Sequence, residues 1–181
     1  MRRKVMGLLF ACTLSGMMLC GCGSKVATPD ENGNYIVDGG FEGTDLSAWM
    51  VNNVNDVTEE INVYTRETDC LSGLQSLHFY SSGDVNFTIE QTLEGLENGT
   101  YKLCGSIQGD TAGDVNSNVY MYAVSAGDEV TVDADLKGYL AWNTVEISSI
   151  EVTDGKLTVG FNVTNAPGGW GTIDDITLVK E

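Results

Sequence analysis

From residue 34 to the C-terminus, short runs of β-branched and aromatic residues alternate with clusters of Gly, Asn and Asp. No stretch carries a sustained helical stripe of apolar residues, so the pattern predicts an all-β protein. Without helices to cover a sheet, about ten strands must pack as two sheets face to face. We therefore expect a jelly-roll β-sandwich. The expected strands are 34–42, 48–53, 60–67, 75–82, 85–94, 99–109, 118–125, 142–154, 155–165 and 170–180.

The two-residue period of a strand assigns side chains to faces. The residues expected in the core are Trp49, Tyr101, Leu103, Ile107, Val119, Met121, Leu157, Val159, Phe161 and Val163. The same alternation turns Ser106, Gln108, Tyr120, Tyr122 and Asn162 outward. Outward tyrosines are candidate ligand contacts, although the strand propensity of tyrosine explains them equally well.

The N-terminus has the features of an export signal. Basic residues at 2–4 precede an apolar run that ends in Leu19-Cys20-Gly21-Cys22. This ending resembles the lipobox of bacterial lipoproteins, with residues 1–21 removed and Cys22 lipidated; an ordinary signal peptide cut nearby is the alternative. Both place the protein outside the cytoplasm. In the first, it is held at the bacterial surface by lipid alone, with 22–33 as a flexible tether and 34–181 as the sandwich.

Two cysteines, Cys70 and Cys104, remain once the signal peptide and the lipidated residue are set aside. In an exported protein such a pair suggests a disulfide. Two separate buried thiols are the alternative, because Cys104 lies within an expected strand and Cys70 beside a turn.

Charge and motif content exclude several functions. The chain has 26 acidic and 9 basic side chains, a net charge of −17, which excludes nucleic acid as a partner. A catalytic (β/α)₈ barrel needs about 250 residues, more than this chain has. The single histidine, His78, accompanies neither Gly-x-Ser-x-Gly nor His-Glu-x-x-His. We therefore predict no catalytic residues and no enzyme activity.

One acidic residue is expected to be buried. The alternation that buries Ile176 and Leu178 also turns Asp174 inward, and a buried carboxylate needs a partner. A structural Ca²⁺ is the predicted partner, bound by Glu42, Asp174, Asp175 and backbone carbonyls, with Asp69 as a weaker further ligand. Backbone amides and water are the alternative partners.

Trp170 stands between Gly168-Gly169 and Gly171, a setting that lets a large ring project from the backbone. An exposed indole in a glycine-rich loop favours a ligand platform, with a packing role as the alternative. Trp142, Tyr120, Tyr122 and Asn162 are further candidates.

The segments GGFEGTDLSAWMV, GLQSLHFY, SIQGDTAGD, VYMYA and GGWGTIDD together resemble family 61 carbohydrate-binding modules. These are β-1,4-galactan-binding domains of the galactose-binding-domain-like superfamily, attached to bacterial endo-β-1,4-galactanases. The resemblance covers residues 34–181 and implies a non-catalytic domain with a bound Ca²⁺. It implies sugar contacts at Gln108, Asp110, Asp114 and Trp170. Asp110 departs from the family pattern, in which a second glycine often follows the Gln-Gly pair.

These features predict a lipid-anchored surface protein that binds a plant-type polysaccharide, β-galactan or arabinogalactan side chains. The alternative is a structural or adhesive surface lipoprotein that binds a protein partner, because β-sandwiches serve many functions.

Overall fold

The computed structural model describes residues 26–54 and 60–181. The predicted signal peptide 1–21 and the predicted lipidation site Cys22 lie outside the described residues. Within the two described stretches, no helix has the length and apolar character that a membrane span requires.

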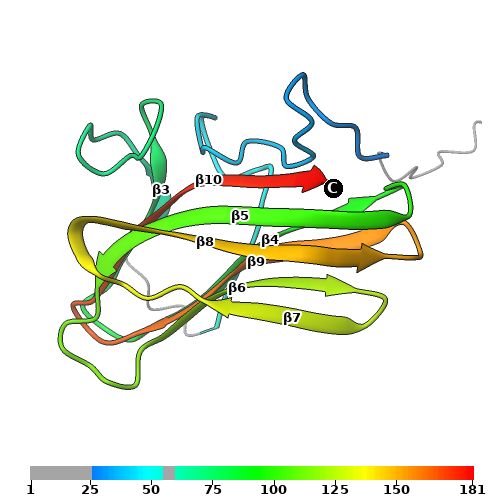
Figure 1. The fold of residues 1–181 in the computed structure, drawn as a ribbon. Coiled ribbons are helices and arrows are strands. Elements are labelled where there is room, and N and C mark those ends of the chain that lie inside the picture. The colour runs from blue at the N-terminus through cyan, green and yellow to red at the C-terminus, as the bar shows by residue number, and fades with distance from the viewer. Residues whose placement is uncertain (1–25, 55–59) are drawn as a thin grey trace, which may run out of the picture.

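The described chain forms a sandwich of two antiparallel five-stranded sheets (Figure 1). The first sheet has the order β1-β4-β9-β6-β7 and the second β2-β3-β10-β5-β8. The predicted all-β sandwich is confirmed. The strands are β1 (Met50–Asn53), β2 (Glu60–Tyr64), β3 (Ser76–Tyr80), β4 (Val85–Glu94), β5 (Gly99–Asp110), β6 (Asn118–Ser125), β7 (Asp128–Asp133), β8 (Gly138–Val152), β9 (Lys156–Asn165) and β10 (Trp170–Lys180).

One expected strand is absent, and one observed strand was not expected. The segment 34–42 is not a strand: Asn34 forms an isolated bridge with Val179, and the chain then turns, with Asp38 and Phe41 in left-handed conformations at φ of 52° and 54°. The strand β7 was missed because its side chains are nearly all exposed and give no apolar alternation. It lies at the edge of the first sheet, where charged residues such as Asp128 and Glu129 discourage pairing with another chain.

The core lies between the sheets and contains each of the apolar and aromatic residues expected there. Phe79 of β3 and Phe87 of β4 meet edge to face across the sandwich, with ring centroids 5.5 Å apart. Trp49 is buried as predicted, stacked on Phe41 at 5.4 Å, and its indole N–H donates to the carbonyl of Asp38.

Residues 26–33, predicted as part of a flexible tether, belong to the domain. Val26 forms a parallel bridge with Glu94, and the N–H of Ala27 donates to the Glu94 carbonyl at 2.7 Å. The Asp30 carboxylate accepts the N–H groups of Asn32 and Asn34 and holds the following turn. The strand β1 pairs with β4 only as far as Glu90, so the end of β4 has backbone groups that need partners, and this segment supplies them at Glu94.

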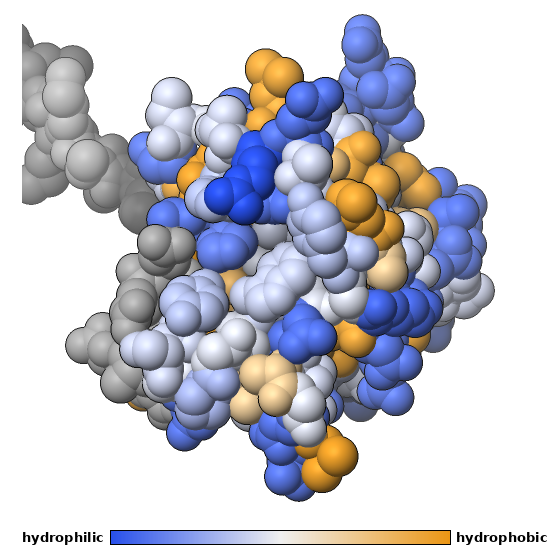
Figure 2. Space-filling view, turned by 90° about the vertical axis from the view of Figure 1, so that its left-hand side faces the viewer, coloured by the Kyte–Doolittle hydropathy of each residue, from blue (hydrophilic) through white to orange (hydrophobic). Residues whose placement is uncertain are grey.

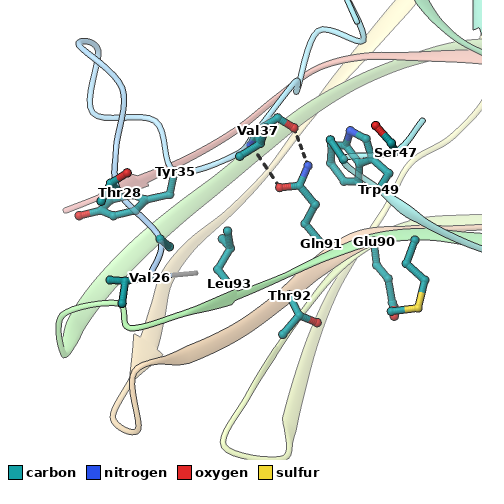
Figure 3. A pocket seen from close by; sticks show the side chains of 13 residues that line it. Val26, Thr28, Tyr35, Val37, Ser47, Trp49, Glu90, Gln91, Thr92 and Leu93 are labelled. Carbon is teal, nitrogen blue, oxygen red and sulfur yellow. Dashed lines mark hydrogen bonds between the residues drawn. The ribbon is translucent and has the colours of Figure 1, made fainter. Parts of the chain in front are cut away.

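A groove of about 670 Å³ lies between this N-terminal segment, the start of β1 and the strand β4 (Figure 3). Gln91 and Leu93 point into it, whereas Thr92 points to the other side of β4. Its floor offers little to a polar ligand, because the Gln91 amide already binds the N–H and the carbonyl of Val37.

Gly171 tests how closely the core is packed. A Cβ atom at this position would collide with the ring of Phe79. We expect Gly171→Ala to lower the free energy of unfolding by about 1–3 kcal/mol, as overpacked cores do. Denaturant unfolding checks this. If the clash is the cause, the double variant Gly171→Ala/Phe79→Leu loses less stability than the two single losses combined; simple additivity would contradict it.

Candidate functional site

The outer faces of the two sheets differ in how far their side chains are exposed to solvent. On the second sheet, Ser106, Gln108, Thr172 and Asp174 are at most 2% exposed because loops cover them. On the first sheet, Thr88, Glu90, Tyr120 and Asn162 remain half-exposed. We call the outer side of the first sheet the open face.

Asp174 is buried as predicted, but on the other side of its sheet. It pairs with Ser106, whose hydroxyl bonds to Thr144 on the outer face, while Ile173 before it lies in the core. A bulge after Asp174, with Asp175 at φ 51°, resets the alternation so that Ile176 returns to the core. The sequence alternation alone could not reveal this reversal.

The expected metal ligands Glu42, Asp174 and Asp175 gather around Gly40. Their oxygens are engaged by the loop before β3. Asp174 accepts the N–H groups of Leu71 at 2.7 Å and Ser72 at 3.3 Å, and its other oxygen accepts the N–H of Asp175. Glu42 accepts the N–H groups of Leu74 and Gln75, and Asp175 accepts the Ser72 hydroxyl.

Asp69, the fourth expected ligand, lies 3.6 Å from the guanidinium of Arg66 instead. Across residues 26–54 and 60–181, no group of three or more His, Cys, Asp or Glu side chains is arranged to hold a metal ion. Backbone N–H groups hold both oxygens of Asp174 and one of Glu42, and a hydroxyl holds one of Asp175, so the alternative protein partners expected from the sequence are present. Calcium binding remains a prediction from the sequence.

The two cysteines are free thiols, not a disulfide. The Cys70 thiol contacts loop carbonyls, including that of Glu67 at 3.5 Å, while the Cys104 thiol lies 3.6 Å from Glu146 on β8. Burial, reinforced by neighbouring carboxylates, raises the pKa of both thiols. Cys70 lies in the loop before β3 and Cys104 lies within β5, so each thiol has its own surroundings.

Gln108, expected to bind sugar, is fully buried and holds two loops. Its amide N–H donates to the Thr68 carbonyl, and its oxygen accepts the N–H of Leu140 at 2.7 Å. We therefore correct its role to a structural one. Leu140 is left-handed at φ 59°, which is strained for a branched side chain. Leu140 and the neighbouring Tyr139 are 59% and 54% exposed.

Trp170 begins β10 and lies between two cross-strand neighbours, Tyr80 of β3 and Asp110 of β5. The Tyr139 ring tilts against the indole, with centroids 6.0 Å apart. We call Tyr80, Asp110, Tyr139 and Trp170 the indole patch. The end of the sandwich that carries it is the one viewed in Figure 2, where pale residues of intermediate hydropathy lie among hydrophilic ones.

Two contributors to this region were missed by sequence reasoning. Tyr80 and Tyr139 lie in separate strands, and only the register through Trp170 brings Tyr80 beside the indole. Two residues before Tyr80 in β3, His78 stacks on Tyr64 at 4.5 Å, and the guanidinium of Arg66 lies 5.2 Å from that tyrosine ring. Nothing in the local sequence signals either arrangement.

The remaining candidates are dispersed. Asp114 lies in the loop after β5, where its carboxylate accepts the N–H of Asn116. Trp142 is half-buried in β8. Tyr120, Tyr122 and Asn162 share the open face, on the other sheet from Trp170. The predicted ligand residues therefore divide between two surfaces.

No protein-family model matches the sequence, and no curated protein matches it. Among solved structures, TmCBM61 in complex with β-1,4-galactotriose has a TM-score of 0.73 and 25% identity, covering 82% of this chain and 99% of that chain. The chain resembles a family 61 carbohydrate-binding module. The resemblance stated from the sequence is thereby confirmed.

Two further carbohydrate-binding modules share the fold at lower identity. A family 4 module has a TM-score of 0.56 and 13% identity, covering 81% of this chain and 99% of its own. The C-terminal family 22 module of Clostridium thermocellum Xyn10B has a TM-score of 0.55 and 16% identity, covering 84% and 96%. All three neighbours are carbohydrate-binding modules, which are non-catalytic domains.

The Asp174 carboxylate gives the fold a distinctive pH dependence. Burial raises its pKa to about 6, from 3.8; the Asp175 charge adds to this, while N–H donors, that of Leu71 foremost, oppose it. Because the folded-state pKa is the higher one, protonation favours folding. In EDTA, we expect this residue's contribution to grow as the pH falls from 7 to 4, by at most about 3 kcal/mol.

Thermal melting of the wild type and Asp174→Asn between pH 7 and 4 measures this contribution, because the difference between them removes the effect of other carboxylates. We expect the stability of the wild type to rise relative to that of Asp174→Asn as the pH falls. A relative stability that falls or stays constant on acidification would contradict the assignment. Adding CaCl₂ at pH 7 tests the calcium prediction separately: bound Ca²⁺ would raise the wild-type melting temperature.

Proposed function

We propose that this protein is a non-catalytic surface lipoprotein, anchored through Cys22, that binds β-1,4-galactan through the indole patch. The similarity to TmCBM61, whose structure contains β-1,4-galactotriose, carries the proposal of the ligand. The lipobox-like ending at Cys22 supports the anchor and the location outside the cytoplasm.

The chemistry of the indole patch suits a galactose ring. A pyranose offers an apolar C–H face, which packs on an aromatic ring, and hydroxyl groups, which need hydrogen-bond partners. Trp170 and Tyr139 meet at an interplanar angle of 60°, so their rings form two sides of a corner. One Asp110 oxygen accepts the N–H of Ala112, which leaves the other carboxylate oxygen for a sugar hydroxyl.

The exposure of the patch also supports a binding role. Tyr139 of the patch and the adjoining Leu140 are more than half exposed although both side chains are large and hydrophobic, and the backbone at Leu140 is strained. Strained positions persist where surrounding contacts over-determine them, and they concentrate at ligand sites. The buried Gln108 amide provides that contact here.

Replacing the indole tests the proposal. We expect Trp170→Ala to weaken binding to β-1,4-galactan at least tenfold at this patch, because the sugar loses its stacking surface. Trp170→Phe should retain part of the affinity. Affinity electrophoresis in β-1,4-galactan, with arabinan, xylan and cellulose alongside, measures the loss and the specificity.

Val115→Ala, in the exposed loop after β5, is the matched control and should bind like the wild type. Melting temperatures establish that each variant is folded. Wild-type protein that binds none of the four polysaccharides would overturn the proposal and favour a protein partner. Release of reducing sugar from galactan would overturn its non-catalytic part.

A further inference from the structure

We propose that the open face of the first sheet is a second carbohydrate-binding surface, which takes a neutral galactoside chain laid across the strands. This inference rests on the proposed function. It concerns different residues, on the opposite sheet from the indole patch.

The strand register aligns one polar row across the whole open face. Asn52 of β1 pairs with Thr88, Thr88 with Asn162, Asn162 with Tyr120, and Tyr120 with Asp133 of β7. Neighbouring strands lie about 4.8 Å apart, so five strands present a row about 19 Å long. The row is therefore long enough for several sugar rings.

The middle of this row has unused hydrogen-bonding capacity. Within the described chain, the Asn162 amide, the Tyr120 hydroxyl and the Asp133 carboxylate make no hydrogen bond with another residue. At the end of the row, the Asn52 amide donates to the Thr88 hydroxyl at 3.2 Å. Amide, phenol and carboxylate groups are suitable partners for sugar hydroxyls, which both donate and accept.

The neighbouring row supports the first one. Gly160 lies between Glu90 and Tyr122 on the two flanking strands, and Glu90 occupies the space that a side chain at Gly160 would need. Tyr122 is buried, and its hydroxyl donates to the Glu90 carboxylate, which fixes the ring. The Tyr120 ring lies 6.2 Å from the Tyr122 ring and is half-exposed. The fixed Tyr122 ring therefore supports Tyr120, and the exposed part of the Tyr120 ring is the surface on which a pyranose can pack.

Charge on the open face restricts the ligand class. The two rows contain the acidic residues Glu90 and Asp133 and no Lys or Arg. An acidic sugar would bring a like charge next to these carboxylates, which is unfavourable. The surface therefore suits a neutral sugar such as galactose and disfavours uronic acids.

Two surfaces on opposite sheets would make each protein molecule bivalent. Calorimetric titration of the purified chain with β-1,4-galactotriose tests this through stoichiometry. We expect two ligands per wild-type chain and one for Trp170→Ala. We also expect one for Asn162→Ala combined with Tyr120→Ala, and none when all three changes are combined.

The matched control is Glu129→Gln, which changes a charge in β7 opposite Val124, away from the two rows. It should bind two ligands. If the double change destabilises the sheet, Asn162→Ala alone, at a half-exposed side chain, should still weaken the second binding event at least threefold.

The outcomes separate the two proposals. One ligand per wild-type chain, lost in Trp170→Ala and unaffected by the open-face changes, overturns the second surface and leaves the proposed function intact. If the single ligand is lost only with the open-face changes, the open face is supported and the indole patch is overturned. If wild-type protein binds no galactotriose, the galactan proposal fails.

Discussion

The sandwich depends on how closely its two sheets can approach. At Gly105 a side chain would meet the ring of Phe161 at 2.9 Å, and at Gly171 one would meet the ring of Phe79. The absence of side chains on one sheet makes room for aromatic rings from the other sheet and from the neighbouring strand. Because interiors are packed to crystal-like density, this matching fixes the spacing of the sheets and the positions of the strand ends.

Buried polar groups then decide which face of the molecule is available. Asp174 fixes the loop before β3 through backbone N–H groups, and Gln108 fixes the segment at Leu140. Each is a polar group whose burial is favourable only with its partners in place. Together they turn the outer face of the second sheet into a covered scaffold. Thr88, Tyr120 and Asn162 on the outer face of the first sheet are only partly buried, so among residues 26–54 and 60–181 this face is the more accessible one.

The architecture and the core were predictable from the sequence because the two-residue period is a local property. The alternation Leu157, Val159, Phe161, Val163 identified the core side of β9 without knowledge of its neighbours. The prediction failed at Asp174, where a bulge reverses the alternation, and at β7, whose exposed edge carries no apolar signal. Sugar contacts were harder to predict: Gln108 has the right chemistry for a ligand but is entirely used in holding loops.

By itself, the sequence determined the all-β class, the core residues of most strands and the resemblance to a carbohydrate-binding module, because these depend on residue type and short-range spacing. Only the tertiary structure decided which polar residues meet. Strand register placed Tyr80 and Asp110 beside Trp170 and aligned Asn162 with Tyr120, while Asp174 became bound to a loop about 100 residues away in the sequence. Such pairings join residues far apart in the chain, and they are fixed by the packing of the whole sandwich rather than by any local preference.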